Sequence, residues 1–242
     1  IFFLFHLYYF SNYFDKIIFV TNNREIVKNL KNILNSNKIE TLKVINEGYD
    51  FGMYYKIFKR FKFENINNLC LANDSCVVIN PLDNIINSFI DSDVEYYGIT
   101  SSNERQTHVQ SYFLMMKKNA IEVFFKYLKK HRIKRKYRKV IKYYELGLSK
   151  NMLQNNIKIG AFYKAPNDFF LNPAYFNVEE LIKQKCPIVK KNILTGNFRH
   201  NAQKHLAENN FKLDANYYIN LVKNNCKNIN VLPPSIFNKK NH

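Results

Sequence analysis

The chain has 242 residues, of which 46 % are hydrophobic, so it is long enough to bury a core and wholesale disorder is excluded. Lysine and arginine outnumber aspartate and glutamate by 37 to 19, which gives a formal net charge of +18. Such an excess favours anionic partners, either nucleotide phosphates, nucleic acid or an acidic membrane surface. An AT-rich genome would also produce this composition, which is rich in Asn, Lys, Ile, Tyr and Phe and poor in Gly, Pro and Trp.

The first half of the chain alternates between helical and extended patterns. The apolar opening segment, residues 1–13, is too short to span a membrane and lacks the basic start and cleavage site of a signal peptide. We interpret it as the apolar face of a helix, and we expect a missing strand before it. Strands are predicted over 15–23, 41–47 and 68–74, and helices over 24–36, 53–61 and 81–91.

The second half continues the alternation. Strands are predicted over 94–102, 109–118 and 157–163, and helices over 119–131 and 138–156. This order predicts an α/β fold with a mainly parallel central sheet flanked by helices. We assign residues 1–195 to one domain and residues 196–242 to a helical C-terminal extension with a loose tail.

Polar side chains cluster where predicted strands end. Three such insertions occupy residues 21–23, 46–52 and 73–75. Ligands of open α/β sheets bind at the carboxyl ends of the strands, where the loops begin. We therefore expect a binding site at this edge of the sheet.

Asn73, Asp74 and Ser75 interrupt two apolar runs. A carboxylate flanked by two small oxygen-bearing side chains can hold Mg²⁺ or Mn²⁺, because both ions prefer oxygen ligands and keep waters or substrate phosphates in their other positions. The alternative is a simple turn, since Asn, Asp and Ser are turn formers. The triplet alone favours the turn.

The segment 46–52 carries two glycines, Gly48 and Gly52, on either side of Asp50. Glycine permits close approach of the backbone to a ligand, and Asp50 could accept hydrogen bonds from a ribose hydroxyl or a base edge. The alternative is a strand-to-helix connection that needs glycine for its own geometry. A lone G-x-x-x-G pattern does not decide between them.

Further polar groups accompany later apolar segments. His108, Gln110 and Ser111 stand at the start of a predicted strand, and Glu145 lies among apolar residues of a predicted helix. Each of them is a surface group or a participant in a site, and Glu145 is a candidate base with a raised pKa. The four cysteines form no C-x-x-C pair, which argues against a zinc site and for free thiols in a reducing cytosol.

Together these stretches resemble the rhamnan synthesis protein F family of bacterial and viral polysaccharide glycosyltransferases. The resemblance covers residues 4–195 and rests on several motifs in the family's order. They are N-x-G-x-D-x-G at 46–52, N-D-S at 73–75, G-I-T at 98–100, H-V-Q-S-Y-F at 108–113, Y-E-L-G-L-S at 144–149 and C-P-I-V-K-K-N at 186–192.

The resemblance implies a GT-A-like, Rossmann-like fold that binds a nucleotide sugar, with N-D-S in place of the usual D-x-D metal motif. It implies an inverting transfer of a sugar, such as rhamnose or another deoxyhexose, from a nucleoside diphosphate to a growing cell-surface polysaccharide. We expect Asp74 to hold Mn²⁺ or Mg²⁺. Candidate bases are Glu145, Glu104 and His108. Candidate donor-binding residues are Asn46, Gly48, Asp50, Gly52, Asn73, Ser75, Gln110 and Ser111.

Residues 126–142 carry ten lysines and arginines and no acid. They form either a solvated surface or a patch attracted to anionic lipid or a lipid-diphosphate acceptor. We expect a cytoplasmic protein, in possible peripheral contact with the inner face of a membrane, that binds a glycan or lipid-linked acceptor and no nucleic acid. The alternative functions are a non-catalytic scaffold of the same fold and a basic nucleic-acid-binding protein.

Overall fold

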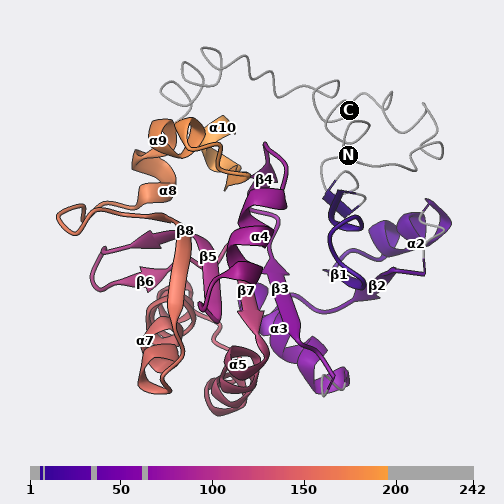
Figure 1. Ribbon diagram of the computed structural model, residues 1–242. Helices are drawn as coiled ribbons and strands as arrows, with labels where there is room; N and C mark the ends of the chain where they lie inside the picture. Colours follow the sequence, from indigo (N-terminus) through magenta and orange to yellow (C-terminus); the bar gives the residue numbers. More distant parts are fainter. Residues whose placement is uncertain (1–5, 8, 34–36, 62–64, 196–242) are drawn as a thin grey trace. The chain divides into compact units, whose positions relative to one another are not determined.

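The computed structural model describes residues 6–7, 9–33, 37–61 and 65–195 (Figure 1). The described part divides into two compact units, one ending at Lys43 and the other beginning at Val44. The predicted extension 196–242 lies outside the described residues, so the predicted domain boundary after residue 195 stays a prediction. Most of the predicted opening helix also lies outside them, although residues 6, 7, 9 and 10 are helical.

The first unit is a strand–helix–strand arrangement. Its two strands, β1 (Ile17–Thr21) and β2 (Ile39–Lys43), pair in parallel, and α2 (Arg24–Ile33) lies between them in sequence. The side-chain oxygen of Asn23 accepts hydrogen bonds from the backbone N–H groups of Glu25 and Ile26, which caps the start of the helix. Leu7 and Leu30 are buried at its core.

The second unit is built on a five-stranded sheet. Its strands are β3 (Asn68–Ala72), β5 (Tyr96–Ser102), β6 (His108–Val109), β7 (Phe113–Lys117) and β8 (Ile159–Lys164). The order is β3–β7–β5, after which β8 pairs with the other edge of β5. β7 pairs with the first residues of β5, and the short strand β6 pairs with its last residues.

The expectation of a mainly parallel central sheet is not confirmed, because this sheet is mixed. β3 with β7, β5 with β7 and β5 with β6 pair antiparallel, and only β5 with β8 pairs in parallel. A parallel neighbour needs a crossover of a dozen or more residues, and the link from β5 to β6 is much shorter. The chain therefore turns back beside β5, and β7 separates β5 from β3.

Helices pack against this sheet and bury a large apolar core. They are α3 (Tyr49–Arg60), α4 (Asp83–Asp91) and α5 (Lys118–His131). Phe124 of α5 is fully buried, and its ring meets the rings of Phe51 and Phe58 from α3. Phe51 also stacks on Tyr144, with 4.7 Å between ring centroids. The start of α3 is thus fixed against the segment that carries Glu145.

The predicted helix over 138–156 is helical but irregular. It consists of α6 (Tyr137–Val140), a π-helical segment η1 (Ile141–Leu146) and α7 (Gly147–Gln154). A π-helical turn shifts the direction of the side chains that follow it and occurs often at functional sites. Glu145 lies in η1.

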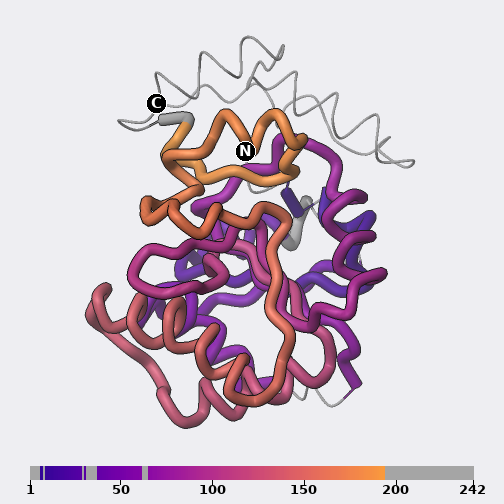
Figure 2. Tube along the Cα trace, turned by 60° about the vertical axis from the view of Figure 1, so that its left-hand side comes forward, coloured from indigo at the N-terminus to yellow at the C-terminus, as the bar shows by residue number. Residues whose placement is uncertain are grey.

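The last described segment contains short helices and a strand. It comprises α8 (Pro173–Phe176), α9 (Val178–Lys183), β9 (Ile188–Lys190) and α10 (Asn192–Thr195). β9 pairs antiparallel with β4 (Cys76–Val78), the strand that follows the N-D-S triplet. In Figures 1 and 2 this segment lies at the opposite end of the unit from α5 and α7.

Candidate active site

The carboxyl ends of three strands meet at one edge of the mixed sheet. β3 and β5 are both antiparallel to β7, so they point the same way, and β8 is parallel to β5. The N-D-S triplet follows the end of β3, and Thr100 and Ser102 lie at the end of β5. Of the three predicted polar insertions, 73–75 follows a strand of this sheet, whereas 21–23 and 46–52 follow β1 and β2, which form a separate two-stranded sheet.

Asn73 connects the triplet to the glycine-bearing segment. Its side-chain amide donates a 2.8 Å hydrogen bond from Nδ2 to Oδ2 of Asp50, in the first turn of α3. The hydroxyl of Tyr54 on the same helix donates to the carbonyl oxygen of Ala72, the last residue of β3. The structure thus brings Asp50 and Asn73 together, as the clustering of polar groups indicated.

The triplet itself forms a turn. Oδ1 of Asn73 accepts hydrogen bonds from the backbone N–H of Ser75 at 3.1 Å and from its hydroxyl at 2.5 Å. This is the local bonding that makes Asn a turn former. Asp74 lies at the exposed corner, and within the described part of the chain its carboxylate takes part in no hydrogen bond or ion pair. The turn therefore leaves one carboxylate available to a ligand.

Asp50 is partly buried, and burial raises the pKa of its carboxyl. The hydrogen bond from Asn73 lowers this pKa, the nearby charge of Asp74 raises it, and the charge of Lys190 lowers it. The net direction is upward. Two carboxylates and one ammonium therefore act on one another at the end of β3.

The two glycines are explained by packing within the chain. Gly48 has φ +81° and precedes α3, and a Cβ there would lie 2.5 Å from a methyl group of Ile133. A Cβ at Gly52 would lie 1.7 Å from the carbonyl oxygen of Glu47. The strand-to-helix connection needs both glycines for its own geometry. Their roles in donor binding stay predictions.

Lys190, which the sequence did not single out, is positioned beside the triplet. It is the last residue of β9 and pairs with Cys76, the residue after Ser75. Its Nζ lies 3.5 Å from Oγ of Ser75 and 4.6 Å from the centre of the Tyr112 ring. Burial lowers the pKa of this ammonium, while the charges of Glu145, Cys76 and Asp50 raise it.

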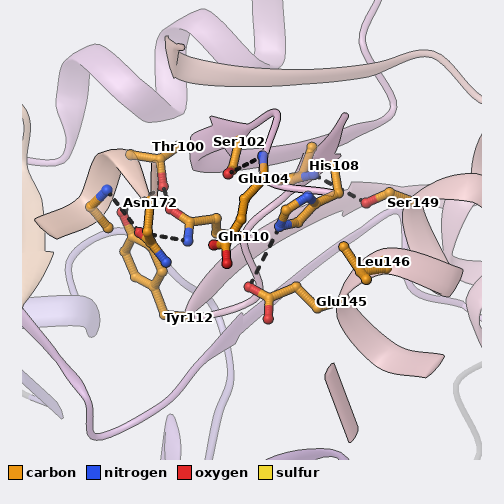
Figure 3. A network of polar contacts seen from close by, with 12 residues as sticks. Thr100, Ser102, Glu104, His108, Gln110, Tyr112, Glu145, Leu146, Ser149 and Asn172 are labelled. Atoms are coloured by element: carbon orange, nitrogen blue, oxygen red, sulfur yellow. Dashed lines mark hydrogen bonds and ion pairs between the residues drawn. The ribbon is translucent and has the colours of Figure 1, made fainter. Parts of the chain in front are cut away.

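A second group of polar side chains lies beneath the end of β5 (Figure 3). The hydroxyl of Thr100 donates to Oε1 of Gln110 at 2.5 Å, and Nε2 of Gln110 donates to Oδ1 of Asn172 at 3.0 Å. Thr100 also shares a 3.1 Å hydrogen bond with the hydroxyl of Tyr112. Thr100, Gln110 and Tyr112 are fully or almost fully buried, so this network fixes the segment between β6 and β7.

His108 and Glu145 face each other in the same region, with 4.0 Å between Nε2 and Oε1 (Figure 3). Nδ1 of His108 lies 2.8 Å from the carbonyl oxygen of Gln106. Because a carbonyl only accepts, Nδ1 carries the proton of that bond and Nε2 faces Glu145. The π-helical turn and the β6 edge thus place an imidazole nitrogen opposite a carboxylate, at a distance just beyond that of a hydrogen bond.

Tyr112 links the two groups. Its carbonyl oxygen accepts a hydrogen bond from the backbone N–H of Asn73, its hydroxyl bonds Thr100, and its ring lies under Lys190. The charge of Glu145 also acts on Lys190. The N-D-S turn, Asp50, Lys190 and Glu145 therefore belong to one polar region at the end of the sheet.

Other predicted residues are less engaged. Asn46 is exposed before α3, and Glu104 is exposed in the turn between β5 and β6. The side chain of Ser111 is half-buried between β6 and β7 and makes no hydrogen bond with the described residues. No contact in the described part of the chain joins these three to Asp74 or Lys190. Their roles as base or donor ligands stay predictions.

The donor set around Asp74 fits a cation only in part. Asp74 supplies an available carboxylate, and Asp50 supplies a second one. The charge of Asp74 raises the pKa of Asp50, and a bound cation would relieve this repulsion between the two carboxylates. Among the described residues, however, no group of three or more His, Cys, Asp or Glu side chains is arranged to hold a metal ion. Mg²⁺ often binds through one or two carboxylates together with substrate phosphates, and this donor set matches that mode.

The cysteines described in the structure take no part in this donor set. Cys70, Cys76 and Cys186 are free, as expected. Burial raises the pKa of Cys76 to about 12, so its thiol stays protonated at neutral pH. A protonated thiol is neither a nucleophile nor a metal ligand.

Sequence reasoning missed three parts of this region. Lys190 stood in a quoted motif without a role, and Tyr112 and Asn172 were not selected. The available signal was the apolar segment 186–190, which ends in lysine and is short enough for a strand. Pairing of β9 with β4, which carries Lys190 to the triplet, depends on tertiary structure.

The chain was compared with models of known families. The model of the family described as Rhamnan synthesis protein F matches residues 17–241. No match to the chain was found among curated proteins. In the described part of the chain, no helix is long and apolar enough to cross a membrane.

Proposed function

The chain belongs to the rhamnan synthesis protein F family, and on this premise we propose that it transfers a sugar from a nucleoside-diphosphate donor to a growing cell-surface polysaccharide. Family membership implies a glycosyltransferase-type role in rhamnan polysaccharide synthesis. The identity of the sugar, rhamnose or another deoxyhexose, and the inverting course of the reaction are parts of the proposal.

One observation carries the proposal. The charge of Asp74 acts on Asp50, and the charges of Asp50 and Glu145 act on Lys190, so these groups form one polar region at the carboxyl ends of β3 and β5. Breaking the bond between the sugar and the phosphate builds negative charge on the leaving diphosphate and positive charge on the sugar. A site for this reaction needs cationic groups that stabilise the negative charge on the leaving diphosphate. It also needs a base that takes the proton of the attacking hydroxyl of the acceptor.

Asp74 and Asp50 are the residues that would hold Mn²⁺ or Mg²⁺ with the donor. A bound divalent ion would offset charge on the leaving diphosphate. Asn73 holds Asp50 in place through its amide, and the Ser75 hydroxyl is held by Asn73. These bonds keep the carboxylate of Asp74 exposed at the corner of the turn.

Glu145 is the proposed general base. His108 faces it at 4.0 Å and is itself oriented by the carbonyl of Gln106. A proton taken from the acceptor hydroxyl by Glu145 could be shared with Nε2 of His108. A positioned base of this kind contributes roughly 100- to 10,000-fold to the rate.

The full chain should be incubated with Mn²⁺ and a panel of nucleoside-diphosphate sugars, including deoxyhexoses, while release of free nucleoside diphosphate is followed with and without a glycan acceptor. We expect release with at least one donor, at a rate that the acceptor increases. A scaffold of the same fold would bind a donor without releasing its nucleotide. Absence of both binding and release across the panel would refute the proposed function.

The basic segment 126–142 borders this site. Arg135 forms an ion pair with Glu47, just before Gly48, and Lys136, Arg138 and Lys139 are exposed. We propose that these exposed charges attract a lipid-diphosphate acceptor or anionic lipid, at about 1 kcal/mol per basic residue near such a surface. Reversal of the three charges should abolish binding to vesicles that contain anionic lipid and leave turnover of a soluble acceptor intact. Unchanged vesicle binding would contradict this role.

A further inference from the structure

We propose that Lys190 binds the diphosphate of the donor, as a cationic ligand separate from any ion held at Asp74. This inference rests on the proposed function and adds the residue that contacts the leaving group. It assigns a role to β9, a strand that neither the composition nor the motifs had connected with the site.

The position of Lys190 is fixed by the backbone of two strands. β4 and β9 pair with Cys76 opposite Lys190, and the backbone N–H of Lys191 donates a 2.7 Å hydrogen bond to the carbonyl oxygen of Ser75. Lys190 therefore stays beside the N-D-S turn whether or not a ligand is present. A substrate phosphate near Asp74 would meet this ammonium without any rearrangement of the strands.

The ammonium of Lys190 has N–H donors that make no hydrogen bond with the described residues. A lysine Nζ carries three N–H donors. In the described part of the chain, the one hydrogen bond of the Lys190 Nζ is the long contact of 3.5 Å to Oγ of Ser75, and no carboxylate forms an ion pair with it within 4.0 Å. The Tyr112 ring at 4.6 Å orients the ammonium by a cation–π contact and takes none of its hydrogens.

Its surroundings indicate an anionic ligand. A partly buried ammonium loses hydration and is stabilised by an ion pair or by strong acceptors. Asp50 and Glu145 are near enough to act on Lys190 electrostatically, but neither pairs with it. Phosphate oxygens offer the strong, multiple acceptors that a lysine binds as a point charge. Lys190 therefore has a fixed position beside the N-D-S turn, and its ammonium has N–H donors left with which to bind one phosphate group.

Binding measurements on the full chain test this role. Affinities for UDP, GDP and dTDP and for the corresponding nucleosides should be measured by calorimetry in Mg²⁺ buffer. The variants are Lys190→Met, Lys190→Arg, and Lys150→Met as a matched control, since Lys150 is exposed and also loses one positive charge.

For the diphosphate that the wild type binds best, we expect Lys190→Met to weaken binding by roughly 10- to 100-fold, the range for one hydrogen bond to a charged group. The affinity for the matching nucleoside should not change. Lys190→Arg should retain most of the affinity, and Lys150→Met should retain all of it. Equal diphosphate affinity in the wild type and Lys190→Met would overturn the proposal for Lys190 and leave the proposed function intact. Failure of the wild type to bind any diphosphate would overturn both.

A second measurement does not depend on whether Lys190→Met folds. Burial lowers the pKa of Lys190 below the ordinary lysine value of 10.5, whereas the terminal phosphate is fully ionised well above its second pKa of about 6. Diphosphate affinity of the wild type should therefore fall as the pH rises from about 8 towards that ordinary lysine value. In Lys190→Arg the affinity should stay constant over that range, and an equal decline in both proteins would contradict the assignment.

Discussion

Asn73 donates a 2.8 Å hydrogen bond to Asp50, and this bond joins two motifs that lie 23 residues apart in the chain. The same Asn73 side chain holds Ser75 through its oxygen. One amide thus shapes the turn that exposes Asp74 and also orients the first turn of α3. The turn that the sequence favoured is therefore present, and it leaves the proposed role of Asp74 in the site open to a bound ligand.

Replacement of Asp50 by Asn should stabilise the protein without ligand at neutral pH. The substituted amide oxygen still accepts from Asn73, and the charge that is buried beside Asp74 is removed. Since the pKa of Asp50 is raised in the folded state, its ionisation costs stability above that pKa and costs nothing below the unfolded value of about 3.9. We expect Tm to rise by on the order of 2–4 °C at pH 7, the change for about 1 kcal/mol in a protein of this size.

The gain in Tm should shrink as the pH is lowered towards 4, which calorimetry or circular dichroism can follow in both proteins. Equal Tm values at pH 7 would show that Asp50 carries no electrostatic cost. Donor affinity in the presence of Mn²⁺ should decrease in the same variant, because Asp50 is proposed to hold the ion together with Asp74. Stability and function would then change in opposite directions at one position.

Replacement of Asp74 by Asn should leave the fold intact and reduce donor turnover by roughly 100-fold or more, the effect of losing a main electrostatic contact to the leaving group. Asp74 is exposed and makes no bond with described residues, so Tm without metal should change little. Mn²⁺ should stabilise the wild type with donor and not Asp74→Asn. Asp91→Asn, at the exposed end of α4, is the control. Full turnover by Asp74→Asn would remove the proposed metal site.

The sequence was sufficient for the local elements and for part of the site. Apolar periodicity located α4 and α5, runs rich in β-branched or aromatic residues located β1 and β5, and a short apolar run located β3. The sequence predicts the insertions 46–52 and 73–75 at the same edge of the sheet, and the structure joins them through the hydrogen bond between Asn73 and Asp50. Helices and strands such as these depend mainly on residues close together in the chain, so the pattern of a single sequence is enough to predict them.

The parts that failed depend on long-range pairing. The sequence pattern predicts one strand over residues 109–118. The chain instead forms β6 and β7 with a break between them, where the Thr100–Gln110–Tyr112 network holds the intervening residues. The placement of Lys190 requires β9 to pair with β4 across more than a hundred residues. The π-helical turn at Glu145 also leaves no periodic signal in so short a segment.

Replacement of Glu145 by Gln should reduce kcat by roughly 100- to 10,000-fold, the contribution of a positioned general base. Donor binding should change by only a few fold, since the proton transfer occurs in the reaction step. Steady-state kinetics with a glycan acceptor would measure both, with Glu122→Gln on the exposed face of α5 as the control. His108→Asn should have a smaller effect on kcat. A normal kcat in Glu145→Gln would assign the base to another residue, with Glu104 as the next candidate.

Replacement of Gly52 by Ala should destabilise the protein by on the order of 3 kcal/mol, because the new Cβ would lie 1.7 Å from the Glu47 carbonyl oxygen and the backbone must move. Gly160→Ala is a milder comparison, since its Cβ would lie 3.1 Å from side-chain atoms of Val94. Urea denaturation of both variants measures the difference. If Gly52→Ala were as stable as the wild type, the tight connection before α3 would not need glycine.

A crystal structure of the full chain with a bound nucleoside-diphosphate sugar and Mn²⁺ tests the proposed donor site most directly. The expected result is electron density for Mn²⁺ on the Asp74 carboxylate, with the diphosphate between that ion and the ammonium of Lys190. A donor bound elsewhere, with the Asp74 and Lys190 side chains out of contact with its phosphates, would contradict the proposed function of this site.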